Sequence, residues 1–189
     1  MSVDSSKITE VLPHVERFPH TRLSRFFRSF FGRIARGLSW VWLALMAVIV
    51  LNVTMRYLFG EGRIEFEEAQ WHLYAVGFLI GLSACMDTDN HVRVDLFHER
   101  MGLRGQAWVE LYGLLLLFFP FVLAMLVFSL PFVAYAFAIG EVSDAPGGLP
   151  FRWVIKAFVP LGMALLLLAG LARLSRACSY LFGWPRRVD

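Results

Sequence analysis

Four long apolar runs, separated by shorter polar segments, dominate the sequence. They lie at about residues 38–58, 67–86, 108–137 and 151–174. Each can cross a hydrocarbon core of about 30 Å as an α-helix, which satisfies its own backbone polar groups. The third run is longer than one crossing needs and contains Pro120 and Pro131, and the fourth contains Pro160. We therefore expect a kink or a tilt in both of these spans.

Residues 21–37 show a helical pattern instead of a continuous apolar run. Apolar side chains recur on one side of a helix, at Leu23, Phe26, Phe27, Phe30, Phe31 and Ile34. The opposite side carries Arg22, Arg25, Arg28, Arg33 and Arg36. This pattern predicts an amphipathic helix in the membrane interface whose arginines face anionic lipid headgroups; a soluble amphipathic helix is the alternative. Residues 1–20 and 177–189 are predicted to be tails, the first of them flexible.

The composition is that of a membrane protein. Of the 189 residues, 58% are apolar and 17% are charged, whereas soluble domains carry about 25% charged residues. The net charge of +3 does not indicate nucleic-acid binding, because the basic residues lie mainly beside the apolar runs. Cys85 and Cys178 lack a paired-cysteine motif and indicate neither a disulfide framework nor a zinc site. The expected fold is an all-α integral membrane protein, with a four-helix membrane domain over residues 38–176 preceded by the amphipathic interfacial helix.

The distribution of lysine and arginine predicts the orientation of the chain. With four spans, both tails, the amphipathic helix and the connection at 87–107 lie on one side of the membrane and carry 14 basic residues. The other side carries four basic residues: Arg56, Arg63, Arg152 and Lys156. Because loops rich in basic residues stay in the cytoplasm, both termini are predicted to be cytoplasmic.

The connection between the second and third runs is the most polar internal segment. Asp87, Asp89 and His91 occupy alternate positions, as at the start of a calcium-binding loop. However, Val92 stands where such a loop needs glycine, and His98 stands where it needs an acidic residue. We therefore reject a calcium site in this segment.

The same segment offers weak metal and haem candidates. His91, Asp95 and His98 would be spaced by about one and two turns on a helix, as a metal site could require. A bis-histidine haem needs ligands from facing helices, and His72, the histidine within a run, lies near the opposite membrane face. We favour a polar connector with a packing or docking role, in which the apolar residues of "HVRVDLF" enter the interface while Arg93 stays hydrated.

A second polar cluster, "EFEEAQWH" at residues 65–72, begins the second run. Acidic side chains are favoured in the first turn of a helix by its dipole, which suffices to explain Glu65 and Glu67. Glu68 and His72 lie deeper, where an unpaired charge is costly. They could pair with each other, and we expect a further partner within the bundle or on another subunit.

Asn52 and Arg56, one helical turn apart at the end of the first run, are candidate partners for Glu68 and His72. A proton relay would use the same residue types, but one Glu–His pair at one membrane face does not form a pathway. The sequence contains no nucleophile–base pattern, phosphate-binding glycine loop or paired carboxylates at membrane depth. We therefore predict a protein that is not an enzyme and that binds no cofactor or metal.

Four sequence motifs, in order and at fitting spacing, carry a family resemblance. "RYLFG" closes the first run, "FEEAQWHLYAVGFLIGLSACM" forms the second, "HVRVDLF" follows it, and "GGLPFRWVIKAFVPLG" leads into the fourth. Over about residues 40–175 the chain resembles the DctQ-like small membrane subunit of tripartite ATP-independent periplasmic (TRAP) transporters. The N-terminal extension is longer than the family minimum.

The resemblance implies a multi-pass protein of the bacterial inner membrane that acts as a scaffold without chemistry of its own. It implies two protein partners: a large permease subunit that carries substrate and sodium ions, and a periplasmic substrate-binding protein that delivers an organic acid, such as a 2-oxo or hydroxy acid. A structural or interfacial role is then expected for Arg56, Glu67, Glu68, His72, His91, Arg93 and Asp95. The alternatives are a stand-alone structural or signalling membrane protein and, less favoured, a haem-binding redox subunit.

Overall fold

The computed structural model describes residues 21–87 and 101–184. They form α2 (Arg22–Phe59), α3 (Ile64–Asp87), α5 (Leu103–Tyr112), the π-helical segment η2 (Gly113–Phe118), α6 (Phe119–Ala138) and α7 (Arg152–Phe182). Because α5, η2 and α6 follow one another without a break, they make up a single span. Within the described ranges, four helical spans are long and apolar enough to cross a membrane, which confirms the predicted all-α membrane fold.

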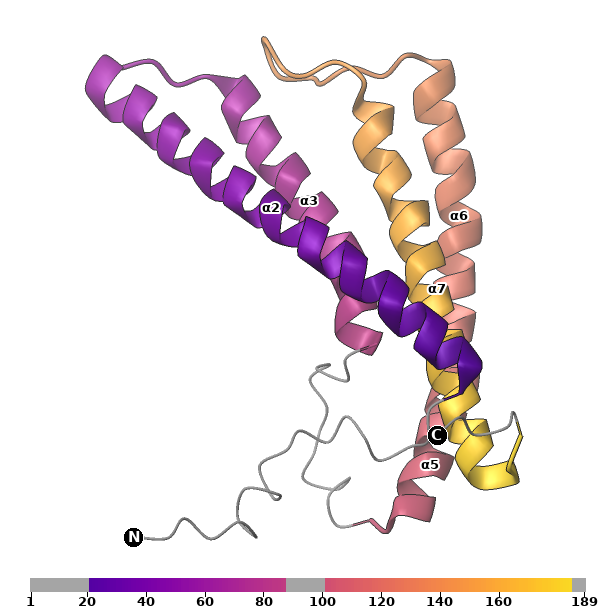
Figure 1. Cartoon of the computed structure of the whole chain (residues 1–189). Coiled ribbons are helices and arrows are strands. Elements are labelled where there is room, and N and C mark those ends of the chain that lie inside the picture. Colours follow the sequence, from indigo (N-terminus) through magenta and orange to yellow (C-terminus); the bar gives the residue numbers. More distant parts are fainter. Residues whose placement is uncertain (1–20, 88–100, 185–189) are drawn as a thin grey trace, which may run out of the picture.

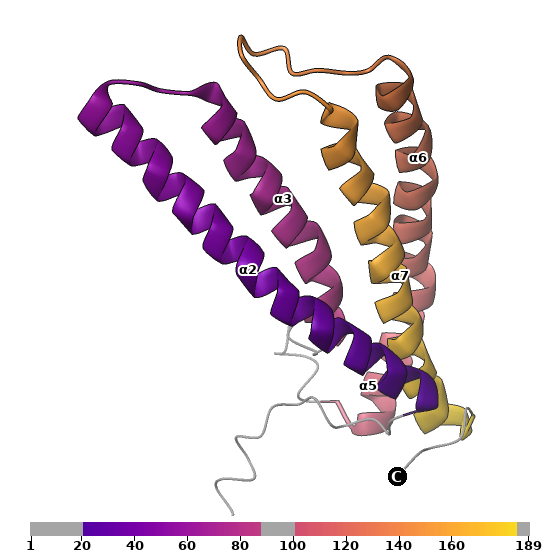
Figure 2. The ribbon, with the colours of Figure 1, turned by 45° about the horizontal axis from the view of Figure 1, so that its top comes forward.

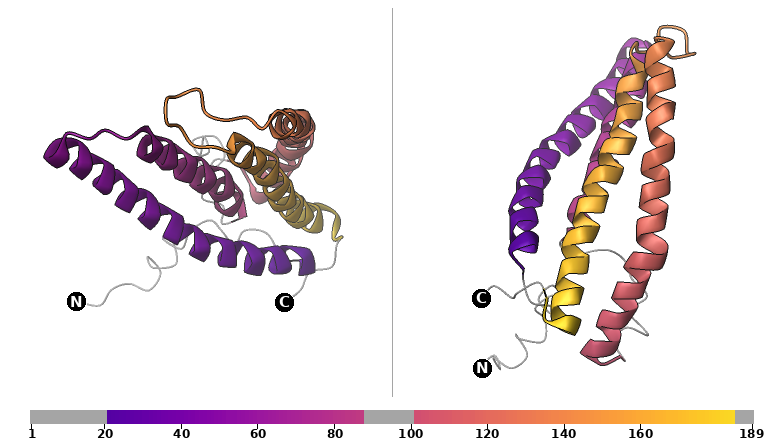
Figure 3. Two further views of the ribbon diagram at one scale, coloured as in Figure 1. Left: turned by 90° about the horizontal axis from the view of Figure 1, so that it is seen from above. Right: turned by 90° about the vertical axis from the view of Figure 1, so that its right-hand side faces the viewer.

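The spans form two antiparallel hairpins. α2 packs against α3, α6 packs against α7, and contacts between α3 and α7 join the two hairpins. The loops at residues 60–63 and 139–151 lie at one end of the bundle, which we call the hairpin end (Figure 1). The start of α2, the end of α3, α5 and the end of α7 lie at the opposite, terminal end. The hairpins lie close together at the terminal end and diverge toward the hairpin end (Figure 2), and α7 runs between α2 and α6 (Figure 3).

The amphipathic segment is not a separate element, because it continues directly into the first span as one 38-residue helix. A capping box between Thr21 and Ser24 satisfies the first backbone groups of α2, and Gly60, with φ +68°, ends the helix in the left-handed conformation. At 1.5 Å per residue this helix is about 57 Å long, nearly twice the thickness of a hydrocarbon core. α2 must therefore tilt or extend beyond the apolar layer.

Much of the phenylalanine face of the amphipathic segment packs against protein. Phe31 belongs to the core and is 2% exposed, while Phe27, Phe30 and Ile34 pack against the same cluster. At the helix start, the Thr21 hydroxyl lies 2.9 Å from the Ser175 hydroxyl of α7. This part of the apolar face is covered because α2 crosses the bundle at the terminal end, whereas Phe26 and the arginines remain exposed.

The third span contains a π-helical segment directly before Pro120. Proline has no N–H to donate, so the regular pattern of hydrogen bonds is interrupted at Pro120. Directly before it, the Phe119 N–H bonds to the Leu114 carbonyl, five residues back, and η2 is the resulting π-helix. α6 and α7 continue through Pro131 and Pro160. The hydrophobic core lies beside η2, where Leu114 and Val122 meet Leu166 of α7.

Candidate functional site

Glu68 is the most strongly engaged of the predicted site residues. It lies in the second turn of α3 and is only 5% exposed. Its carboxylate accepts a hydrogen bond from the Ser143 hydroxyl and another, 2.5 Å long, from the Leu149 N–H. Both donors belong to the 139–151 loop, which reaches from the second hairpin toward the start of α3 (Figure 1). Glu68 therefore joins the two hairpins at the end where their helices diverge.

The 139–151 loop is shaped to place both donors against this carboxylate. The Ser143 N–H bonds to the Leu149 carbonyl at 3.3 Å, which closes the loop on itself. A Cβ atom on Gly148 would lie 2.4 Å from the Ser143 Cβ and 3.0 Å from Glu68 Oε1, so a side chain does not fit at this position. Gly147 has φ +78°, a conformation that favours glycine. The "GG" of the sequence motif thus allows the loop to approach α3.

Arg56 does not bind Glu68, as the sequence had suggested it could. It lies 3.6 Å from Glu67, and this ion pair is solvent-exposed at both side chains. The ring of His72 contacts the main-chain oxygen of Glu68 at 2.6 Å through Nδ1, while the Glu68 carboxylate faces the loop. Sequence reasoning identified Glu68 as a residue in need of a partner, and the partners come from a loop about 75 residues away.

A half-buried ion pair supports the same loop from its other side. Lys156 in the first turns of α7 pairs with Glu141, and its ammonium lies 4.2 Å from the centre of the Phe132 ring. The Arg152 N–H also donates to the Glu141 carbonyl at 3.1 Å. In the sequence, Lys156 had contributed only to the predicted orientation. Its position inside an apolar run was the signal that it needs a partner.

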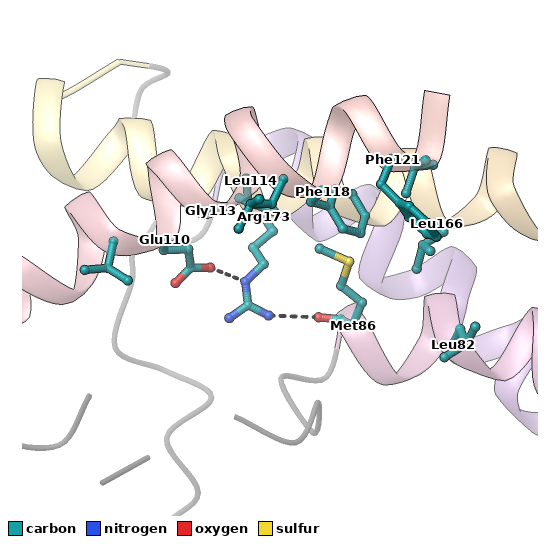
Figure 4. A pocket seen from close by; sticks show the side chains of 12 residues that line it. Leu82, Met86, Glu110, Gly113, Leu114, Phe118, Phe121, Leu166 and Arg173 are labelled. Carbon is teal, nitrogen blue, oxygen red and sulfur yellow. Dashed lines mark hydrogen bonds and ion pairs between the residues drawn. The ribbon is translucent and has the colours of Figure 1, made fainter. Parts of the chain in front are cut away.

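A second polar contact, at the terminal end, was missed by sequence reasoning. Arg173 of α7 forms a buried ion pair with Glu110 of α5, and its Nη1 lies 3.4 Å from the carbonyl oxygen of Met86 near the end of α3. Figure 4 shows this arginine between the two partners, at one end of an apolar cavity. The available signal was one carboxylate inside the third run and one arginine at the end of the fourth.

Three of the predicted site residues, His91, Arg93 and Asp95, lie outside the described residues. Within residues 21–87 and 101–184, no three His, Cys, Asp or Glu side chains come close enough to hold a metal ion. The polar side chains described above instead connect separate elements of the chain. Glu68 connects α3 to the 139–151 loop, and Arg173 connects α7 to α5 and α3.

Comparison with known proteins identifies the family. The family model described as "Tripartite ATP-independent periplasmic transporters, DctQ component" matches residues 45–179. This range includes the Glu68 contact, the Arg173 contact, the second half of the first hairpin and nearly all of the third and fourth spans, but it begins within α2. No curated protein matches the chain significantly. The chain belongs to the DctQ family, the small inner-membrane permease component of tripartite ATP-independent periplasmic transporters.

Proposed function

We propose that this chain is the scaffold on which the large permease subunit of its transporter is held, and that it neither carries substrate nor catalyses a reaction. In this proposal the large subunit carries substrate and sodium ions, and a periplasmic substrate-binding protein delivers an organic acid such as a 2-oxo or hydroxy acid. Membership of the family supports a tripartite assembly of this kind.

The observation that carries the scaffold role is that ionisable side chains within the spans serve contacts between elements of this chain. Glu68 binds the 139–151 loop, and Glu110 binds Arg173. Charged groups in or near lipid are costly unless they are paired, so such contacts hold helices in fixed positions. A rigid four-helix unit suits a support for a moving partner better than it suits a transport pathway of its own.

The orientation proposed for this scaffold places the hairpin end in the periplasm and both termini in the cytoplasm. This orientation is supported by the distribution of basic residues, of which 14 belong to the side of the termini and four to the side of the hairpin loops. The exposed arginines of α2, Arg22, Arg25, Arg28, Arg33 and Arg36, are proposed to contact anionic lipid on the cytoplasmic side. The exposed apolar side chains of α2 and α6 are left for lipid and for the large subunit.

The test is Glu68→Gln in the chain co-expressed with its large subunit and binding protein. A glutamine carries no charge and offers one acceptor oxygen in place of two, so the contact with the 139–151 loop weakens. We expect a lower yield of purified complex, with substrate uptake reduced in the same proportion. Uptake per assembled complex should stay unchanged. Asp95→Asn is expected to behave in the same way.

Glu61→Gln is the matched control, since Glu61 is also an acidic residue of the hairpin end but forms only an exposed ion pair with Arg63. It should leave both yield and uptake at the level of the unmodified chain. Loss of transport in a Glu68→Gln complex that assembles normally would contradict the scaffold role, as would substrate transport by this subunit alone in liposomes.

A further inference from the structure

The first hairpin carries an exposed aromatic patch, made of Trp42 from α2 and of Tyr74 and Phe78 from α3. The Trp42 and Tyr74 rings lie 6.0 Å apart between centres, and the Tyr74 and Phe78 rings are stacked at 6.1 Å. The three side chains are 41%, 53% and 48% exposed. Trp42 rests on Gly77, where a Cβ atom would lie 3.0 Å from its ring. The rings therefore form one continuous surface, about half of which the described residues leave uncovered.

The aromatic patch lies inside the apolar layer and not at its edge. Tyr74 and Phe78 follow Glu68 in α3 by six and ten residues, which places them about 9 Å and 15 Å further along the helix. Phe78 is then about midway between Glu68 and Asp87, the charged residues that bound the apolar part of α3. Because the Trp42 ring contacts the Tyr74 ring, the indole lies at a similar depth.

Two members of the patch carry polar groups that lipid tails cannot satisfy. The Trp42 indole N–H is a donor, and the Tyr74 hydroxyl is both a donor and an acceptor. Neither group has a hydrogen-bond partner within the part of the chain that the structure describes. Tryptophan and tyrosine at a membrane surface direct these groups to the headgroups, which explains the exposed Trp71 close to Glu68. Tyr74 and Trp42 lie deeper, where a partner for these groups has to come from protein.

The exposed face of the third span has a different chemistry at the same depth. Its large exposed side chains between residues 115 and 132 are all leucine, phenylalanine, valine or methionine. Lipid tails are as apolar as these side chains, so lipid covers such a face as well as a protein does. Polar groups within the layer favour association with another helix instead. The first hairpin therefore offers a better surface for a protein partner than the third span.

We propose that the aromatic patch is the contact surface for a transmembrane helix of the large permease subunit, which supplies a hydrogen-bond acceptor to Tyr74 or Trp42. The assignment rests on the proposed function, in which the large subunit is the other membrane protein of the transporter. A soluble periplasmic protein does not reach a surface about 9–15 Å beyond Glu68 in the apolar layer. Tyrosine and tryptophan are also the residues that most often dominate the binding energy of protein interfaces.

The first experiment replaces Phe78 with photoreactive p-benzoylphenylalanine in the full chain, co-expressed with its large subunit and binding protein. Phe128 is the matched control position, because it is an exposed phenylalanine in the apolar part of another span. Both replacements keep an aromatic side chain at a position where space is available. After illumination, we expect a covalent adduct with the large subunit from the Phe78 position and loss of that adduct when the photoreactive group is at Phe128.

The second experiment uses Tyr74→Phe, which removes only the hydroxyl. A hydrogen bond between helices in a membrane changes their association equilibrium about three- to twentyfold. We expect the association constant of this variant with the purified large subunit in micelles to fall by about that factor. Tyr135→Phe is the control, because Tyr135 is an exposed tyrosine near the end of α6. It should leave the association constant unchanged.

Equal adducts from the two photoreactive positions would overturn the proposal, as would adducts from Phe78 with only lipid or a second copy of this chain. An association constant that Tyr74→Phe leaves unchanged would also overturn it. The scaffold role survives these results as long as the unmodified chain assembles with the large subunit. Failure of the unmodified chain to bind the large subunit would instead refute the proposed function, and with it this assignment.

Discussion

Breaking the Arg173–Glu110 pair should destabilise the bundle strongly, whereas replacing both residues with apolar ones should not. The two side chains are 10% and 7% exposed, so each charge lies largely away from water. Removing one partner of a buried ion pair costs about 3–5 kcal/mol, because the other charge stays buried without it. We expect this cost for Arg173→Met and for Glu110→Leu alone. Arg173→Met also removes the contact with the Met86 carbonyl, so it should be the more damaging of the two.

The double substitution, Arg173→Met with Glu110→Leu, leaves neither charge in the interior. Apolar replacement of a buried pair is often neutral or stabilising. We therefore expect the double variant to lie within about 1–2 kcal/mol of the unmodified chain, and the coupling between the two sites to be several kcal/mol. This contrast distinguishes a true buried pair from two side chains that merely lie close together.

The assay is reversible unfolding of the purified chain in mixed micelles, with the free energy of unfolding of all four members of the cycle measured under one condition. Glu65→Leu is the control, because Glu65 is exposed in the first turn of α3. Additive losses, with the double variant about as unstable as the sum of the single variants, would refute the reasoning. Losses below about 1 kcal/mol in both single variants would also refute it, since that is the value of an exposed pair.

Two further predictions concern topology and helix packing. In spheroplasts of a variant without its native cysteines, Gly62→Cys should react with a membrane-impermeant thiol reagent and Arg104→Cys should not; the reverse result would invert the proposed orientation. Gly162→Ala should lower the free energy of unfolding by about 1–3 kcal/mol, because its Cβ would lie 3.0 Å from the Leu79 Cβ and 3.2 Å from the Leu79 carbonyl oxygen. Gly32→Ala, at an open position, should instead be neutral or raise it by up to about 1 kcal/mol, and equal effects of the two changes would contradict this packing of α7 on α3.

The number of the spans was predictable from the sequence, whereas the shape of the third and the role of the segment before the first were not. A kink or a tilt was expected in the third span, but the sequence did not indicate that the irregularity would be a π-helix at Gly113–Phe118 that borders a cavity. Residues 21–37 were predicted as an interfacial helix. Their amphipathic pattern is real, yet the pattern alone cannot tell whether an apolar face meets lipid or another helix, and here Phe31 enters the core.

The candidate site was predictable in part. Glu68 lies deep enough in its apolar run that an unpaired charge there would be costly, so the sequence showed that it needs a partner. This cost depends only on the position of the residue along its own helix. The identity of that partner depends on which loop reaches α3, and the structure brings Ser143 and Leu149 to it. Nothing in the sequence indicated that Glu110 and Arg173, which are 63 residues apart in the chain, would pair with each other.

The number of spans, the helical fold and the family of this protein can all be read from the amino-acid sequence. These properties depend on short segments of the chain. An apolar run of sufficient length must form a helix in lipid, because only then are its backbone N–H and C=O groups hydrogen-bonded, and each family motif lies within a few consecutive residues. In contrast, the contacts by which Glu68 joins the hairpins at one end and Arg173 joins them at the other, and the cavity between them, arise only when the helices are packed together. Such contacts depend on how each helix is rotated and crossed against its neighbours, and these angles are set by the packing of all side chains together.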